Sequence, residues 1–293
     1  MGKPYQRIGF CYVLIIASAT IGGCFPFNKQ IDPAKGERIF VHDSTDYLRH
    51  FAVHSWNPNQ EGKNYWGLEA TMDVYGYNLE PQQQSMSSIW IYIIGGGKSK
   101  ITGFSVGWHV YPELYNDSRT HFFTTWAGYE SPPGGCYNFQ CPGYIRMNSS
   151  ISPGDVITPV SSFKGKKQYI TIRAVKDKQS GDWQVHYGFN GPTQLIGYFP
   201  KSLFRDMEKK HLIIQFGGFA SHPTTQPSPP MGSGFFPGRN AASFNNLKFV
   251  DAEGSAHDIN KDIPVYQSSP SCYRISTIAS GVFFYGGHGY CDI

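Results

Sequence analysis

Ser105 and His109 are the first residues whose types could do chemistry, because a serine beside a histidine can form a nucleophile–base pair. Both fall on one face of a predicted strand that begins at Gly103, with Gly107 between them. Residues four apart on a strand are separated by about 13 Å, at about 3.3 Å per residue. Ser105 and His109 therefore cannot form such a pair, and His109 is interpreted as a polar strand residue.

Glu113 and Glu130 lie nearby in the sequence and are the candidates for acid–base chemistry. Glu113 is interpreted as a carboxylate at a rim or in a loop, and a catalytic role for either glutamate stays open as an alternative. His50 and His54 have helical spacing but no supporting ligands, and the other histidines are dispersed. The sequence therefore predicts no metal site and no cofactor.

The strand that positions Ser105 and His109 alternates between two kinds of side chain. Its apolar face is made by every second residue: Phe104, Val106, Trp108 and Val110. The opposite face carries only small or polar residues. This period-two pattern is typical of a half-buried antiparallel strand, and the small, polar face leaves room for a ligand.

Further strand patterns recur along the chain at roughly ten-residue spacing, with turn residues between them. They cover residues 65–75, 87–94, 144–147, 156–159, 168–175, 183–187, 212–216 and 243–250. The late strand 212–216 is expected to end at Gly217 and Gly218, and the one tolerable helix pattern covers residues 202–212. The sequence predicts an all-β protein, an antiparallel β-sandwich of two packed sheets.

Composition supports this class and excludes some functions. The 293 residues include 33 glycines and 20 prolines, which indicates short elements joined by many turns. Aromatic and charged residues each make up 16% of the chain, and the formal net charge is +4. The basic residues are scattered apart from a lysine group at 164–167 that resembles a charged hairpin turn, so no nucleic-acid partner is predicted.

Residues 1–24 are predicted to form a secretory signal peptide. Two basic residues precede an apolar run from Ile8 to Ile21, and small residues follow it. The run is too short for a comfortable membrane span, so no stable span is predicted. Residues 25–49 are interpreted as a short flexible lead-in and residues 50–293 as one domain, secreted to the extracellular space or the cell wall. The oligomeric state stays open.

The cysteines agree with export, because disulfides persist in oxidising compartments. Cys11 falls inside the predicted signal peptide, and Cys24 is left over if cleavage precedes it. Four cysteines remain in the domain: Cys136, Cys141, Cys272 and Cys291. They allow three connectivities, of which we favour the sequential one. Two glycosylation sequons begin at Asn116 and Asn148.

Four ordered motifs carry a resemblance to a known family. They are Gly107–Asp117, Gly135–Asn138 with Cys141–Gly143, Gly197–Pro200 with Leu203–Phe204, and Met231–Gly234 with Phe236–Pro237. Together these motifs resemble the neprosin domain of plant secreted proteins, from about His50 to the C-terminus. The resemblance implies a sandwich of antiparallel sheets and, in active members, a glutamic endopeptidase that cleaves at proline.

The chemistry of such an endopeptidase uses two carboxylates facing each other across a cleft. Close like charges keep one of them protonated at mildly acidic pH, so the pair can activate water and polarise the scissile carbonyl. The family pattern places one glutamate two residues before Gly107 and the other directly after Gly217–Gly218. Those positions hold Ser105 and Phe219 here. Neither side chain can replace a carboxylate, so no catalytic residue is intact.

Three functional hypotheses follow from this loss. The first is a catalytically inactive secreted protein that holds a Pro-rich peptide or cell-wall glycoprotein in the inherited cleft, with Trp108, Trp126 and Tyr198 at its edges. The alternative is an active glutamic-type endopeptidase cleaving at proline, in which one of the nearby glutamates serves instead. The third is a structural wall protein whose groove is closed by Phe219.

Overall fold

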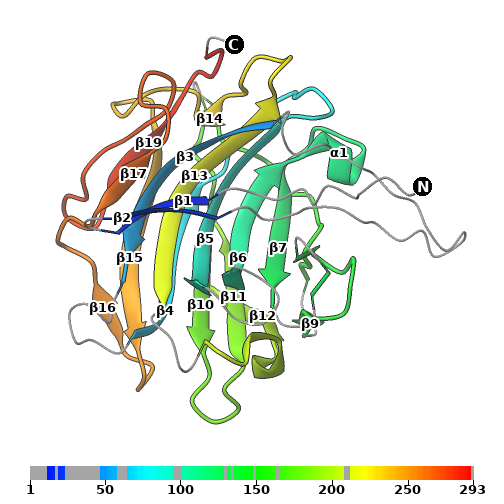
Figure 1. Cartoon of the computed structure of the whole chain (residues 1–293), viewed down its shortest axis with the longest axis vertical. Helices are drawn as coiled ribbons and strands as arrows, with labels where there is room; N and C mark the ends of the chain where they lie inside the picture. Colours follow the sequence, from blue (N-terminus) through cyan, green and yellow to red (C-terminus); the bar gives the residue numbers. More distant parts are fainter. Residues whose placement is uncertain are drawn as a thin grey trace, which may run out of the picture.

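The computed structural model is nearly all β, with two large antiparallel sheets packed face to face (Figure 1). This confirms the predicted sandwich. The structure describes residues 12–16, 19–23, 47–57, 65–94, 101–128, 131–132, 135–147, 150–162, 165–207 and 212–291. Within these ranges no helix is long and apolar enough to cross a membrane.

The first sheet has seven strands and carries the candidate site. In spatial order they are β17 (Val265–Gln267), β3 (Tyr47–Trp56), β13 (Ile213–Pro223), β5 (Gln84–Ile94), β6 (Ile101–Val110), β7 (His121–Ala127) and β8 (Cys136–Tyr137). The strand predicted around Ser105 is β6, at the centre of the β5–β6–β7 array.

The second sheet has ten strands and covers one face of the first. Its main order is β14 (Met231–Gly232), β19 (Phe283–Gly287), β15 (Ala242–Asp251), β4 (Tyr65–Asp73), β10 (Tyr169–Lys176), β11 (Trp183–Phe189), β12 (Gln194–Phe199) and β9 (Ile145–Arg146). The edge strands β16 (Ala256–Asp258) and β18 (Arg274–Ile275) pair with β15 and β19. A separate antiparallel pair, β1 (Tyr12–Ile16) and β2 (Ala19–Gly23), lies in the predicted signal segment.

The main core lies between the two sheets, and the apolar face of β6 contributes every second side chain of that strand to it. Phe104, Val106, Trp108 and Val110 are all buried there. Trp108 is fully buried, and its indole N–H donates to the carbonyl of Asp73 at 2.9 Å. The alternation of side-chain types along β6 is therefore confirmed. The strand is not half-buried as predicted, because Ser105, Gly107 and His109 on its other face are buried as well.

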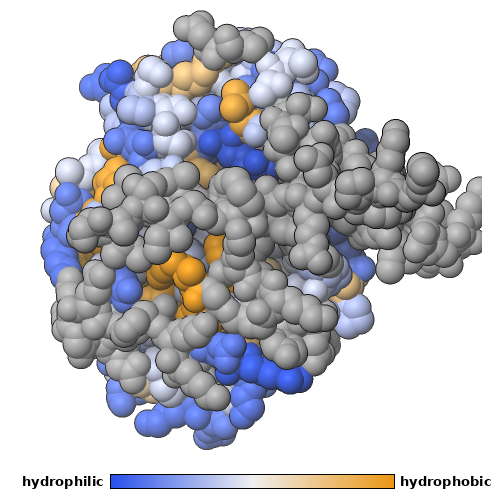
Figure 2. Space-filling model, in the orientation of Figure 1, coloured by the Kyte–Doolittle hydropathy of each residue, from blue (hydrophilic) through white to orange (hydrophobic). Residues whose placement is uncertain are grey.

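The opposite side of the seven-stranded sheet, called the outer face from here on, has a second apolar cluster. Its buried members are Phe51, Val53, Met86, Phe123, Tyr137 and Phe219. Trp90 and Tyr111 pack against them. Figure 2 shows hydrophobic residues near the middle of this view. The sheet thus buries apolar side chains on both faces.

The late strand does not end at its glycines, which corrects the prediction. β13 continues for five residues beyond Gly218, to Pro223, and pairs with β3 and β5 along its length. A Cβ at Gly217 would lie 2.3 Å from the carbonyl oxygen of Ala52, so glycine is needed for the close approach of β3 rather than for a turn. Phe219 therefore lies within a strand.

Other expectations had mixed outcomes. Both sequential disulfides are present, Cys136–Cys141 and Cys272–Cys291, with Cα–Cα distances of 6.0 and 5.7 Å. The predicted helix is a short 3-10 turn, η3 (Lys201–Phe204), where described. The strand predicted at 156–159 is only an isolated bridge between Val156 and His121. Cys11, Cys24, Glu130, Asn148 and most of the lead-in lie outside the described residues.

Candidate functional site

Phe219 and Ser105 both lie on the outer face, two strands apart. Phe219 on β13 is opposite Phe51 on β3 and Met86 on β5. Its ring meets the ring of Phe51 edge-on, with centroids 4.9 Å apart, and the residue is only 5% exposed. The position that the family pattern assigns to a glutamate is therefore filled by apolar packing.

Ser105 lies on the same face but in a different row, where a row is a set of residues directly paired across neighbouring strands. It is opposite Trp90 on β5 and Thr125 on β7, and Trp90 is in turn opposite Gln215 on β13. Ser105 is 2% exposed, and its Oγ has no hydrogen-bond partner among the described residues. Because Gln215 precedes Phe219 by four residues, the rows are about 13 Å apart along the strand.

His109 lies in the row of Phe219, with Met86 between them. It is fully buried, and its ring stacks on Phe123 with centroids 4.2 Å apart. Burial, helped by the charge of His121, lowers the pKa of His109 well below its usual value. A neutral, buried imidazole cannot reach a substrate, so His109 serves the fold, as its interpretation as a polar strand residue predicted.

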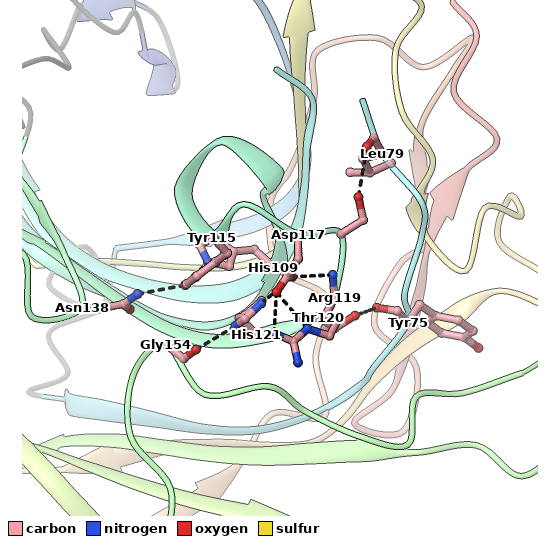
Figure 3. A network of polar contacts seen from close by, with 11 residues as sticks. Tyr75, Leu79, His109, Tyr115, Asp117, Arg119, Thr120, His121, Asn138 and Gly154 are labelled. Atoms are coloured by element: carbon pink, nitrogen blue, oxygen red, sulfur yellow. Dashed lines mark hydrogen bonds and ion pairs between the residues drawn. The ribbon is translucent and has the colours of Figure 1, made fainter. Parts of the chain in front are cut away.

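The hydroxyl of Tyr115 links His109 to the second motif. Asn138 Nδ2 donates to this hydroxyl at 2.8 Å, so the hydroxyl proton is free to bond the Nε2 of His109 at 2.6 Å (Figure 3). Tyr115 reaches this point because the single-turn helix α1 (Pro112–Tyr115) reverses the chain after β6. Pro112 begins that turn, and Asn116 ends it with a positive φ of 59°. The first two motifs therefore meet in one hydrogen-bonded unit.

His121 extends this unit on the other side of Tyr115. The two rings are stacked with centroids 3.7 Å apart. Nδ1 of His121 lies 2.7 Å from the carbonyl of Gly154, and Nε2 lies 3.0 Å from Oδ1 of Asp117. Although burial opposes it, hydrogen bonds from Arg119 and His121 lower the pKa of Asp117 to about 2. Asp117 is thus an ionised anchor for the turn and is committed to these partners.

The remaining candidates do not assemble a catalytic pair. Glu113 accepts a long hydrogen bond from the Tyr111 hydroxyl at 3.5 Å, at the rim where α1 meets the sheet. Burial and the nearby Glu113 carboxylate raise the pKa of Tyr111 well above its usual value. Among the described residues, no three His, Cys, Asp or Glu side chains gather as a metal site, and His50 and His54 lie on β3.

The three aromatic residues proposed as cleft edges are elsewhere, which corrects that expectation. Trp108 and Trp126 belong to the core between the sheets. Tyr198 lies on β12 of the ten-stranded sheet. The outer face is instead lined by Phe51, Met86 and Trp90, which the sequence reasoning missed. Alternation along β3 and β5 was the available signal.

Comparisons with known proteins found similar solved structures and a matching family model. At 10% identity and a TM-score of 0.40, the structure is similar to Scytalido-glutamic peptidase in a complex with a peptide-based transition-state analogue, with 83% of this chain and 97% of that chain covered. SCP-B, a member of the Eqolisin family of peptidases bound to the tripeptide Ala-Ile-His, matches over the same shares at 9% identity and a TM-score of 0.40. Alginate lyase Aly36B with an alginate trisaccharide matches over 55% of this chain and 70% of that chain, at 14% identity and a TM-score of 0.32. The Neprosin family model matches residues 81–288, and the chain therefore belongs to the Neprosin family.

Proposed function

We propose that this chain is a secreted, non-catalytic member of its family that binds a Pro-rich peptide or glycoprotein segment on the outer face. The observation that carries the proposal is Phe219, packed against Phe51 where a catalytic carboxylate is expected. Ser105 at the other position has a hydroxyl with no accessible pKa near working pH. A reaction that needs two carboxylates has neither of them here.

Peptide binding is supported by the chemistry of the outer face. Trp90 is a partly exposed aromatic residue of this face, and it lies beside the small residues Ser88 and Gly107, which are themselves buried. Flat aromatic surfaces next to small residues suit the preformed polyproline II helix, which loses little entropy on binding. The two disulfides are compatible with the secreted location included in the proposal.

The test is a titration with a Pro-rich decapeptide that is acetylated and amidated, so that neither end is charged. We expect the Trp90→Ala variant to bind at least tenfold more weakly than the unmodified protein. Tyr198→Ala, which truncates another partly buried aromatic on the other sheet, is the matched control and should bind normally. Equal binding by all three proteins would contradict peptide binding on the outer face.

A second candidate function is a structural protein with no ligand at this face. The burial of Phe219 and Met86 favours it, because apolar side chains fill the centre of the face. Under this hypothesis the capped decapeptide does not bind at all. An active peptidase using Glu113 or Glu130 is the remaining alternative, and only cleavage of a peptide would support it.

A further inference from the structure

The fourth motif lies away from the outer face and lines a hollow at the edge of the sandwich. Phe236 and Pro237 of this motif form one side of a cavity that is open to solvent and has a volume of about 660 Å³, beside β17 and β18. The other lining residues are Gln267, Pro270, Ser271, Arg274 and Ile275. This volume is within the range of small-molecule sites, about 300–1,000 Å³.

Arg274 is the charged group of this cavity, and it is held in place without an acidic partner. Its Nε–H donates to the carbonyl of Pro270 at 2.9 Å. Its guanidinium carbon lies 4.5 Å from the centre of the Phe236 ring. None of the seven lining residues is acidic, and among the described residues Arg274 forms no ion pair. The guanidinium of Arg274 is therefore held in position, and its charge can pair with an anion that enters the cavity.

The other polar groups of the cavity are donors as well. Oε1 of Gln267 accepts the backbone N–H of Ile275 at 2.9 Å, while its Nε2 has no hydrogen bond among the described residues. Ser271 Oγ makes only a long contact of 3.8 Å with the sulfur of Cys272. A guanidinium, an amide NH₂ and a hydroxyl thus line the same space. Such a set complements an anion that accepts several hydrogen bonds.

The apolar residues around these donors determine what kind of molecule can carry the anion. Phe236 presents a ring, and Pro237, Pro270 and Ile275 add apolar surface. We propose that this cavity binds a carboxylate attached to an aromatic or prolyl body, supplied either by a small organic acid or by the C-terminus of a peptide. Arg274 would pair with the carboxylate, and because Pro270 and Phe236 already fix the guanidinium, little side-chain entropy is lost on binding.

The first arm of the test compares N-acetyl-L-phenylalanine with its carboxamide by NMR titration of the full chain. We expect the acid to bind at least tenfold more tightly than the amide, to shift the signals of Gln267 and Ile275, and to weaken with added salt. Arg274→Gln should remove the preference for the acid. Lys178→Gln, which removes an exposed cation on a turn outside the cavity, is the matched control and should leave binding unchanged.

The second arm separates the two sources of the carboxylate. Acetyl-Ala-Pro-Ala-Phe with a free C-terminus should bind at least tenfold more tightly than N-acetyl-L-phenylalanine if the natural ligand is a peptide end, and equally if it is a small acid. Equal binding of acid and amide, or an unchanged preference in Arg274→Gln, would overturn the site. The capped decapeptide used for the outer face has no carboxylate, so the two proposals can fail independently.

Discussion

At the scale of single residues, Phe219 occupies the position where the family pattern places a glutamate. The side chain is almost completely buried and contacts Phe51 within the outer-face cluster. A carboxylate at this position would need water or a partner, and the apolar neighbours supply neither. Phe219 is therefore a packed residue of the outer-face cluster, and we expect it to stabilise the fold.

Phe219→Ala should lower the free energy of unfolding by about 3 kcal/mol, as expected for truncating a buried phenylalanine. Urea denaturation measures this loss. Phe235→Ala is the matched control, because Phe235 is 43% exposed and its truncation should cost less than about 0.5 kcal/mol. A neutral effect of Phe219→Ala would mean that the outer-face cluster is not packed in solution.

Tyr115→Phe should cost about 1–3 kcal/mol, because it removes the hydroxyl shared by His109 and Asn138 and leaves both buried groups without that bond. The thermal midpoint measured by circular dichroism reports the loss. Tyr290→Phe removes a hydroxyl from a residue that is 71% exposed and should have no effect. If both variants unfold at the same temperature as the parent, the network contributes nothing to stability.

At the scale of elements, a buried histidine pair joins β3 and β13 to the C-terminal segment. His50 Nε2 and His222 Nε2 are 3.0 Å apart. Nδ1 of His222 faces two carbonyls and so carries its proton, which leaves its Nε2 to accept from His50. Nδ1 of His50 then accepts from the hydroxyl of Ser269. The chain of bonds is complete only when both rings are neutral.

This pair predicts a loss of stability in acid. Burial, followed by the charge of His222, lowers the pKa of His50 to about 4. His50 is neutral in both states above its ordinary pKa of about 6.5, so it contributes no pH dependence there. Between about pH 6.5 and 4 the unfolded chain binds the proton and the folded one does not, so stability falls by on the order of 3 kcal/mol.

The measurement is the free energy of unfolding in urea from pH 7 to pH 4. The groups that face His50 are His222 on β13 and Tyr273, whose ring packs against it. We expect the fall in the free energy of unfolding between pH 7 and pH 4 to become smaller in His50→Gln and to stay unchanged in His288→Gln, an exposed histidine whose ring only contacts Phe236 among the described residues. A fall that is the same in His50→Gln and the parent would show that other groups cause the acid sensitivity.

At the scale of the whole molecule, local patterns predicted the strands but not how they align. The alternation along residues 104–110 correctly separated the apolar face from the small, polar face of Ser105, but both faces are buried, so the expectation of a half-buried strand was wrong. That alternation already placed Trp108 on the other side of the sheet from Ser105. Trp108 should therefore not have been chosen as a cleft edge. Register between strands depends on tertiary packing, and the sequence could not show that Ser105 and Phe219 occupy different rows.

Contacts made across long loops were also beyond the sequence. The motif residues Tyr115 and Asn138 are 23 positions apart, and only the fold shows that they share a hydrogen bond. The motif at Phe236 likewise meets Arg274 through sheet topology rather than through spacing. Sequence motifs therefore identified the residues of both regions, while their partners had to come from the structure.

The measurement that tests the central claim most directly is mass-spectrometric detection of cleavage. The purified chain is incubated at acid pH with a proline-containing peptide substrate. We expect the peptide to stay intact, because Ser105 and Phe219 cannot replace two carboxylates. Cleavage after proline that disappears in Glu113→Gln or Glu130→Gln, and persists in the control Glu253→Gln, would contradict it.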